Sequence, residues 1–194
     1  MRVLLTCFEP FGGSTTNVST DVAQMFTTEK SDWELSVVQL PVSFKRIRNV
    51  LSELIDNIKP DVILMLGQAS KRANISIERI AVNLMGATTP DNDGFSPADQ
   101  PIISGESIAF LSTFPLKQIV DQCKDENIKM DISNSAGLYV CNCAFYNALQ
   151  LSKEKKLACK IGFIHLPKLE NIKSQNSPLQ YMFDAVKIAL KTTE

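Results

Sequence analysis

The sequence predicts an α/β fold: a single-domain, three-layer α/β/α sandwich around a mostly parallel, twisted central sheet. Short apolar runs alternate with helical patterns along the chain, as expected for strands joined by helical crossovers. One run, Val62 to Leu66, is almost entirely apolar, which is typical of a strand covered on both faces. The 194 residues, 44% of them hydrophobic, suffice for one core without disulfides or metal. We therefore expect one domain spanning residues 1–194.

The elements are predicted in chain order. Strands are expected at Val3 to Thr6, Leu35 to Leu40, Val62 to Leu66 and Ile161 to Leu166. Between the second and third, Ser43 precedes apolar residues at 44, 47, 51, 54 and 55, the spacing of one helix face with Ser43 as its cap. Further helices are expected from about Asp21, from Pro115 through Glu126, from Cys141 through Lys155, and from Pro178 through Lys191, the last capped by Ser177.

Two segments between the third and fourth strands are less regular. Ile75 and Ile77, then Ile80 and Val82, alternate as a strand does, but the parity switches near Glu78, which indicates a β-bulge there. Segment 86–106 is rich in Gly, Pro, Asp and Asn, so we expect a long surface excursion that frames a site.

Composition excludes several classes of function. The net charge is −1, with 20 basic and 21 acidic residues spread along the chain, so nothing resembles the basic footprint of a nucleic-acid-binding protein. The apolar run at the N-terminus is too short for a signal peptide, and no segment approaches the roughly 20 apolar residues of a membrane span. The five cysteines, an odd number, are expected to be reduced thiols. These features predict a cytoplasmic protein without a membrane or nucleic-acid partner.

His165 is the only histidine of the chain. Any mechanism that needs an imidazole base near neutral pH must therefore use it, and a multi-histidine metal site within one chain is excluded. A lone histidine in an apolar strand is more often a hydrogen-bonded core residue. His165 is predicted at a strand end before Pro167, however, where ligands of α/β sheets bind.

Cys141 is the best candidate partner, because it lies where an apolar stretch meets a helix. At a helix N-terminus the unpaired amides and the helix dipole favour the thiolate and can also bind an oxyanion. The alternative is an inert buried thiol. The spacing of Cys141 and Cys143 does not fit a thiol redox motif, and two cysteines with one histidine make a poor zinc site.

Two more segments complete the candidate site. Glu78 is the acid chosen to orient His165. If it follows the second strand register, its side chain shares a strand face with Ile80 and Val82. The alternative interpretation is that Glu78 and Arg79 form a solvated charge pair. Phe8 and Phe11 follow the first strand and suit an apolar pocket wall, because the loop lacks the lysine and hydroxyl residue of a nucleotide-binding loop.

Read together, these segments resemble the pyroglutamyl peptidase I family of cytosolic cysteine peptidases. Several blocks occur in the family's order, and they span nearly the whole chain: Leu4 to Gly13, Gly67 to Ala69, Ile77 to Asn83, Pro90 to Asn92, Ala136 to Asn142 and Gly162 to Pro167. The resemblance implies an enzyme without cofactor or metal that removes an N-terminal pyroglutamyl residue from peptides through a thioester acyl-enzyme. It also implies a homo-oligomer, with a tetramer as the expected state.

The resemblance assigns roles to individual residues. Cys141 is the nucleophile, His165 the general base and later acid, and Glu78 the residue that orients the imidazole. The substrate-binding positions by resemblance are Phe8, Phe11, Asn17, Gln68 (through its backbone), Thr89, Tyr139 and Val140. The Cys141 amide would bind the oxyanion together with position 88. A small uncharged lactam needs apolar walls and hydrogen bonds to its amide, which agrees with this set.

Thr88 is the most serious departure from the family pattern, because typical members carry there an arginine that stabilises the oxyanion. Losing an oxyanion donor costs about a hundredfold to a thousandfold in turnover, although the Thr88 hydroxyl can still donate one hydrogen bond. Cys7, Cys143 and Lys168 also depart from the pattern. The alternatives are thus a catalytically weak relative that binds lactam-containing ligands, or a peptidase with altered ring preference.

Overall fold

A six-stranded central sheet organises the computed structural model, which describes residues 1–174 and 177–194. Its strand order is β2-β1-β3-β8-β4-β7. The strands are β1 (Arg2–Phe8), β2 (Glu34–Leu40), β3 (Val62–Gln68), β4 (Ile75–Glu78), β7 (Met130–Ser133) and β8 (Lys160–Leu166). Strands β2, β1, β3 and β8 are mutually parallel, whereas β4 is antiparallel to β8 and parallel to β7. The predicted mostly parallel sheet is confirmed.

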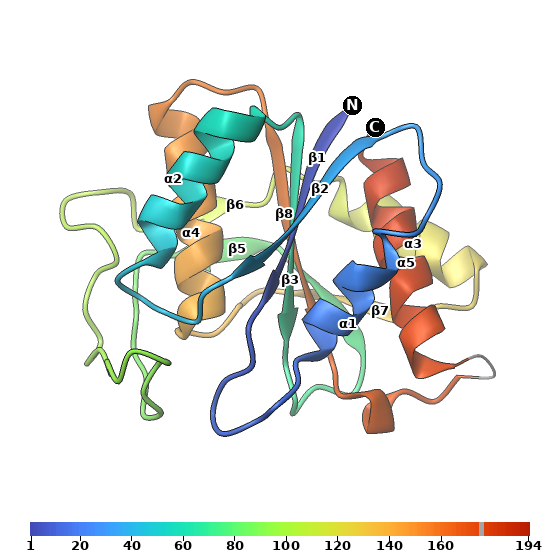
Figure 1. Cartoon of the computed structure of the whole chain (residues 1–194), viewed down its shortest axis with the longest axis horizontal. Helices are drawn as coiled ribbons and strands as arrows, with labels where there is room; N and C mark the ends of the chain where they lie inside the picture. Colours follow the sequence, from blue (N-terminus) through green and yellow to red (C-terminus); the bar gives the residue numbers. More distant parts are fainter. Residues whose placement is uncertain (175–176) are drawn as a thin grey trace.

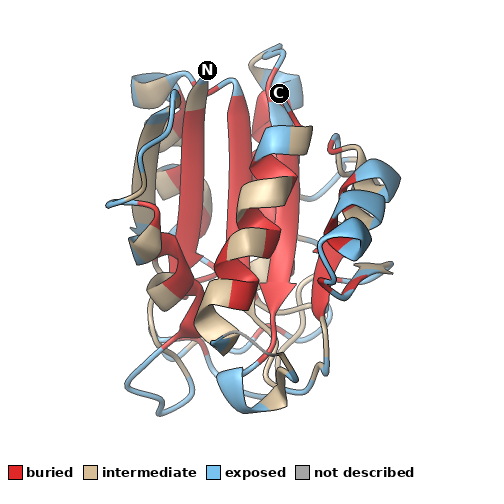
Figure 2. Cartoon of the chain, turned by 90° about the vertical axis from the view of Figure 1, so that its right-hand side faces the viewer, coloured by how far each residue is buried: buried red, intermediate tan, exposed pale blue. Residues whose placement is uncertain are grey.

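Helices cover both faces of this sheet (Figure 1). One face carries α1 (Val18–Met25), α3 (Leu116–Asp125) and α5 (Pro178–Thr192), and the other carries α2 (Ile47–Ile58) and α4 (Val140–Glu154). A short 3-10 helix, η1 (Leu169–Asn171), follows β8. Figure 2 shows the central strands buried while the helices expose their outer sides. The α/β/α sandwich predicted from the sequence is therefore present. Among the described residues, no helix combines the length and apolarity needed to cross a bilayer.

The helix ends follow from their capping residues. The Ser177 side chain accepts a hydrogen bond from the Gln180 amide at the start of α5, as predicted. Helix α1 begins earlier than expected, because Asn17 caps it by accepting from the Ser19 amide. Ser43 also accepts from the amide of Arg46, although the regular turns of α2 begin only at Ile47.

The β-bulge predicted near Glu78 is wrong. Strand β4 of the central sheet ends at Glu78. After Arg79 the chain enters β5 (Ile80–Val82), which pairs with β6 (Ala109–Leu111) in a separate two-stranded sheet. Arg79 joins the two, since its amide donates to Ser133 and its carbonyl accepts from Ser112. The parity switch marks a change of sheet, so Glu78 does not share a strand face with Ile80 and Val82.

Candidate active site

Three neighbouring strands present a residue at or next to their last position to helix α4. In β3 and β8 the residues that pack toward α2 and α4 are odd-numbered, whereas in β4 Ile75 and Ile77 pack toward the opposite face. Because side chains alternate along a strand, positions 67, 78 and 165 all lie on the α4 side. Gly67 and His165 are direct register partners across β3 and β8. The topology thus places positions 67 and 165 at the carboxyl ends of β3 and β8, and the antiparallel strand β4 brings Glu78 alongside them.

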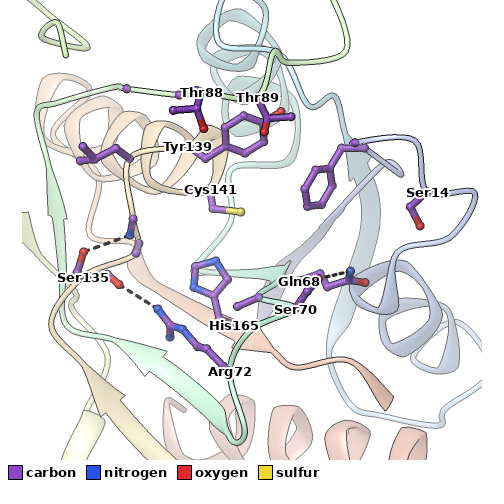
Figure 3. Close-up of a pocket in the computed structure, with 18 of the residues that line it drawn as sticks. Ser14, Gln68, Ser70, Arg72, Thr88, Thr89, Ser135, Tyr139, Cys141 and His165 are labelled. Carbon is purple, nitrogen blue, oxygen red and sulfur yellow. Dashed lines mark hydrogen bonds between the residues drawn. The ribbon is translucent and has the colours of Figure 1, made fainter. Parts of the chain in front are cut away.

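Cys141, in the first turn of α4, lies directly above this group. A Cβ atom added to Gly67 would lie 3.0 Å from the Cys141 sulfur and 2.8 Å from the ring of Phe163. Glycine at position 67 therefore leaves the space that the thiol occupies. Since the side chain of His165 rises from the neighbouring strand on the same face, the imidazole stands beside the sulfur. Figure 3 shows both groups facing one cavity.

Glu78 holds the imidazole from the opposite side. The Nδ1 atom of His165 is 2.7 Å from Oε1 of Glu78, and the Glu78 side chain is 0% exposed while His165 is 4% exposed. The interpretation of Glu78 and Arg79 as a solvated charge pair is therefore wrong, because Arg79 is exposed whereas Glu78 is buried. With Nδ1 engaged by the carboxylate, Nε2 remains available to the thiol, which is the arrangement of a nucleophile, base and orienting acid.

Arg72 is a fourth member of this group that the sequence did not reveal. It donates to Glu78 Oε1 at 2.6 Å through one terminal nitrogen and to the Ser135 carbonyl at 2.9 Å through the other. Figure 3 shows the guanidinium on the same wall of the cavity as His165, bonded to the loop that precedes α4. No periodicity or motif signals such a contact.

The electrostatics favour a neutral resting pair of thiol and imidazole, which differs from the thiolate expected at a helix N-terminus, because burial outweighs the helix dipole. Burial and the nearby negative Glu78 raise the pKa of Cys141 to about 12, against the opposing charge of Arg72. Burial also lowers the pKa of His165, although its hydrogen bond to Glu78 opposes this change. Burial works against ionisation of Glu78. Its hydrogen bond to His165, the attraction of that imidazole when it is protonated, a hydrogen bond from Ser133 and the charge of Arg72 together lower the pKa of its carboxyl. At neutral pH the imidazole is therefore free to accept the thiol proton.

The first turn of α4 is fixed by Asn142, a second residue that sequence reasoning missed. Its side chain is fully buried, accepts from the Val82 amide and donates to the carbonyls of Val82 and Leu84. The helix begins at Val140, one residue before the predicted start, so Cys141 is its second residue. The backbone amide of Cys141 belongs to the first turn of α4, where N–H groups have no partner within the helix and the helix dipole is positive. These amides can bind an oxyanion.

A small apolar cavity adjoins the sulfur. It has a volume of about 10 Å³ and is lined by Phe8, Phe11, Asn17, Val42, Gln68, Tyr139, Val140 and Cys141. The polar side chains among these are already engaged: Asn17 donates to the Glu9 carbonyl and caps α1, while Gln68 accepts from the Val18 amide. The structure thus brings together six of the seven predicted substrate-binding residues, and Asn17 and Gln68 also hold the start of α1.

Thr89 lies apart from that cavity, in a wide cleft of about 850 Å³ that also exposes Cys141 and His165. Thr88 and Thr89 are exposed on the cleft wall, and Figure 3 shows both above Cys141. Their segment belongs to the predicted excursion at 86–106. It is held in place by Asp91, which accepts from the amides of Phe44 and Phe95, and by the Tyr139 hydroxyl, which donates to the Pro90 carbonyl.

The family model described as pyroglutamyl peptidase matches residues 1–194. The chain belongs to the pyroglutamyl peptidase family. Similar relatives include the pyrrolidone-carboxylate peptidase of Thermococcus onnurineus, 43% identical over 86% of this chain and 84% of the relative. Pyrrolidone-carboxylate peptidase 1 of Caldanaerobacter subterraneus is 39% identical over 96% of this chain and 93% of the relative.

Solved structures agree with this membership of the pyroglutamyl peptidase family. The pyrrolidone carboxyl peptidase of Thermococcus litoralis superposes with a TM-score of 0.91 at 35% identity, covering 99% of this chain and 92% of the other. A variant of the Pyrococcus furiosus enzyme gives a TM-score of 0.92 at 39% identity, covering 100% and 98%. Across residues 1–174 and 177–194, no three His, Cys, Asp or Glu side chains gather in a way that could hold a metal ion.

Proposed function

We propose that this protein is a cysteine exopeptidase that hydrolyses the N-terminal pyroglutamyl residue from peptides. The observation that carries this proposal is the position of the Cys141 sulfur between the orienting pair His165–Glu78 and a small cavity walled by Phe8, Phe11 and Tyr139. An uncharged ring suits aromatic walls, and the adjoining cleft has space for the rest of a peptide. The relatives' names describe the same chemistry.

Acylation begins when Nε2 of His165 accepts the Cys141 proton as the sulfur attacks the carbonyl carbon that follows the lactam ring. The developing oxyanion receives hydrogen bonds from the amides in the first turn of α4. The bond from this carbon to the peptide nitrogen then breaks, and His165 gives its proton to the departing amine. The product at this stage is a thioester between the pyroglutamyl group and Cys141.

Deacylation repeats these steps with water as the nucleophile. His165 accepts a proton from the water, whose oxygen attacks the thioester carbon. The carbon–sulfur bond breaks, and His165 returns the proton to the sulfur. Pyroglutamic acid leaves and the thiol is restored, so no cofactor or metal is consumed.

A pair of fluorogenic amides tests the proposal. We expect hydrolysis of a pyroglutamyl amide under reducing conditions and no comparable hydrolysis of the matching prolyl amide. Prolyl has the same ring size but lacks the lactam carbonyl and carries a protonated ring nitrogen. It would therefore leave hydrogen-bond donors of the site unpaired and place a charge against aromatic walls, and loss of such hydrogen bonds typically costs about ten-thousandfold in selectivity. Equal rates for the two substrates, or none for either by a folded protein, would refute the proposed activity.

Thr88 provides a second test, because it places an uncharged, exposed side chain on the cleft wall. Thr88→Arg is expected to raise kcat for the pyroglutamyl amide by up to about a hundredfold, since an added cation can stabilise the oxyanion. Thr88→Gln is the matched control, since it extends into the cleft without charge and should give little of the gain. If only Thr88→Arg turns over substrate and the wild type merely binds it, the protein is the weak binding relative.

We further infer that residues 1–194 form one catalytic domain that acts in the cytoplasm as a homo-oligomer, with a tetramer as the expected state. The five free cysteines suit a reducing compartment. Ile108, just before β6, and Leu111, the last residue of β6, are 87% and 64% exposed, and exposed apolar side chains that lie together are often covered in oligomers.

A further inference from the structure

Arg72 provides a fixed positive charge that the proposed chemistry does not yet use. Its guanidinium is half-buried and forms two contacts, one to the Glu78 carboxylate and one to the Ser135 carbonyl. Oε1 of Glu78 accepts from both Arg72 and His165, while Oε2 has no hydrogen-bond partner among the described residues. The polar groups around this buried carboxylate are the imidazole, the guanidinium and the hydroxyl of Ser133, its register partner on β7. Of these three, only the guanidinium carries a permanent charge.

We propose that Arg72 is a positioning residue of the catalytic site, which holds the ionised Glu78 against His165 and ties both to the loop that leads to Cys141. The inference rests on the proposed peptidase function for its activity readout. A fully buried carboxylate without a countercharge would protonate or pull away from its partner, because desolvation strongly disfavours an isolated charge. The imidazole cannot supply that countercharge in the resting enzyme, since it must be neutral to act as a base.

The second contact gives Arg72 a geometric role as well. Ser135 lies in the loop that follows β7, and this loop turns at Gly137, where φ is +78°, before it enters α4 at Val140. By bonding the Ser135 carbonyl, Arg72 connects the segment that carries the nucleophile to the acid that orients the base. One forked side chain therefore fixes both halves of the site, which a lysine with a single ammonium group cannot reproduce.

The charges around Arg72 predict a pH effect of known sign. Arg72 lowers the pKa values of Glu78, His165 and Cys141 through its charge. On the neighbouring strand β7, Asp131 is exposed and accepts from the Asn74 amide, so it is occupied at the surface. Activity requires neutral His165 and ionised Glu78. Because removal of Arg72 raises both of these pKa values, it must move the acid limb of the activity profile to higher pH.

The experiment compares kcat/KM against pH for the wild type, Arg72→Gln, Arg72→Lys and Arg79→Gln. Arg79 is the matched control, because it is adjacent to Glu78 in sequence but exposed. For Arg72→Gln we expect a lower kcat and an acid limb about one pH unit higher, the usual effect of a nearby charge. Arg72→Lys should keep the acid limb close to its wild-type position but retain only part of the wild-type kcat. Arg79→Gln should match the wild type in both respects.

A profile of Arg72→Gln with its acid limb at the wild-type position would overturn the proposal, because a merely structural contact lowers activity without moving that limb. If Arg72→Gln does not fold, Arg72→Ala assayed with millimolar guanidinium replaces it. Guanidinium is then expected to restore activity and the acid limb, whereas urea, which is similar in shape but neutral, is not. Equal effects of guanidinium and urea would also refute the role of the charge.

Alkylation of Cys141 separates this proposal from the proposed activity. The rate of iodoacetamide labelling at Cys141, followed against pH by peptide mass spectrometry, reports thiolate formation without any substrate. In Arg72→Gln this labelling profile should move to higher pH, and in Arg79→Gln it should not. If the wild type fails to cleave the pyroglutamyl amide but the labelling profile moves as expected, the activity is refuted and the role of Arg72 stands.

Discussion

Replacing Cys141 with alanine is expected to lower kcat for a pyroglutamyl amide at least about ten-thousandfold, as loss of a nucleophile does in enzymes that act through a covalent intermediate. The change removes only the sulfur, at a position in the first turn of α4 where alanine is readily tolerated. Steady-state hydrolysis and the thermal unfolding temperature should be measured on the same preparation. The unfolding temperature is expected to change little.

Cys143→Ala is the matched control for this variant. Cys143 is buried in the same helix turn, and burial raises the pKa of its thiol to about 12 as well. It does not line the cleft or the small cavity, so its loss should leave kcat close to the wild-type value and cost some stability. If Cys143→Ala were as inactive as Cys141→Ala, or if Cys141→Ala retained turnover, Cys141 would not be the nucleophile.

Glu78→Gln is expected to lower kcat by about a hundredfold to ten-thousandfold, because a neutral amide neither fixes the imidazole tautomer reliably nor stabilises the imidazolium. The pH profile should change in a direction opposite to that of Arg72→Gln. The hydrogen bond and charge of Glu78 raise the pKa of His165. Without them this pKa falls further, and the acid limb of the residual activity moves to lower pH.

Glu170→Gln serves as the control for the loss of one carboxylate near the site. Glu170 is exposed in η1 and forms an ion pair with Lys168 at 3.6 Å, a surface contact of little energetic weight. Its profile should coincide with that of the wild type. A Glu78→Gln variant with near wild-type kcat, or with an acid limb moved to higher pH, would contradict the orienting role of Glu78.

The parallel strands and the positions of Cys141 and His165 beside one cavity could be predicted because each rests on local information. The apolar runs of β1, β3 and β8 mark strands covered on both faces, and Ser177 caps α5 through its own neighbours. A single histidine at a strand end reduced the search for a base to one residue. Cys141 followed from its place at the start of a helix.

Other features depend on contacts between distant segments and could not be predicted in the same way. The alternation from Ile75 to Val82 continues across a change of sheet, so periodicity indicated a bulge where the strand ends. Strands β6 and β7 have only three and four residues and are partly exposed, which leaves a weak pattern. Arg72 bonds Ser135 and Asn142 bonds Val82, partners 63 and 60 residues away, and nothing in their local sequence distinguishes them from surface residues.

The small cavity beside Cys141 has a consequence for inhibitor discovery. Its volume of about 10 Å³ is roughly that of one water-sized sphere, so no five-membered ring fits between Phe11 and Tyr139 as they stand. We expect the two rings, whose centroids lie 5.8 Å apart, to separate when a ligand enters from the adjoining cleft. Docking small molecules against the unliganded conformation would therefore reject true ligands, whereas screening with covalent fragments, which trap the opened form, would recover them.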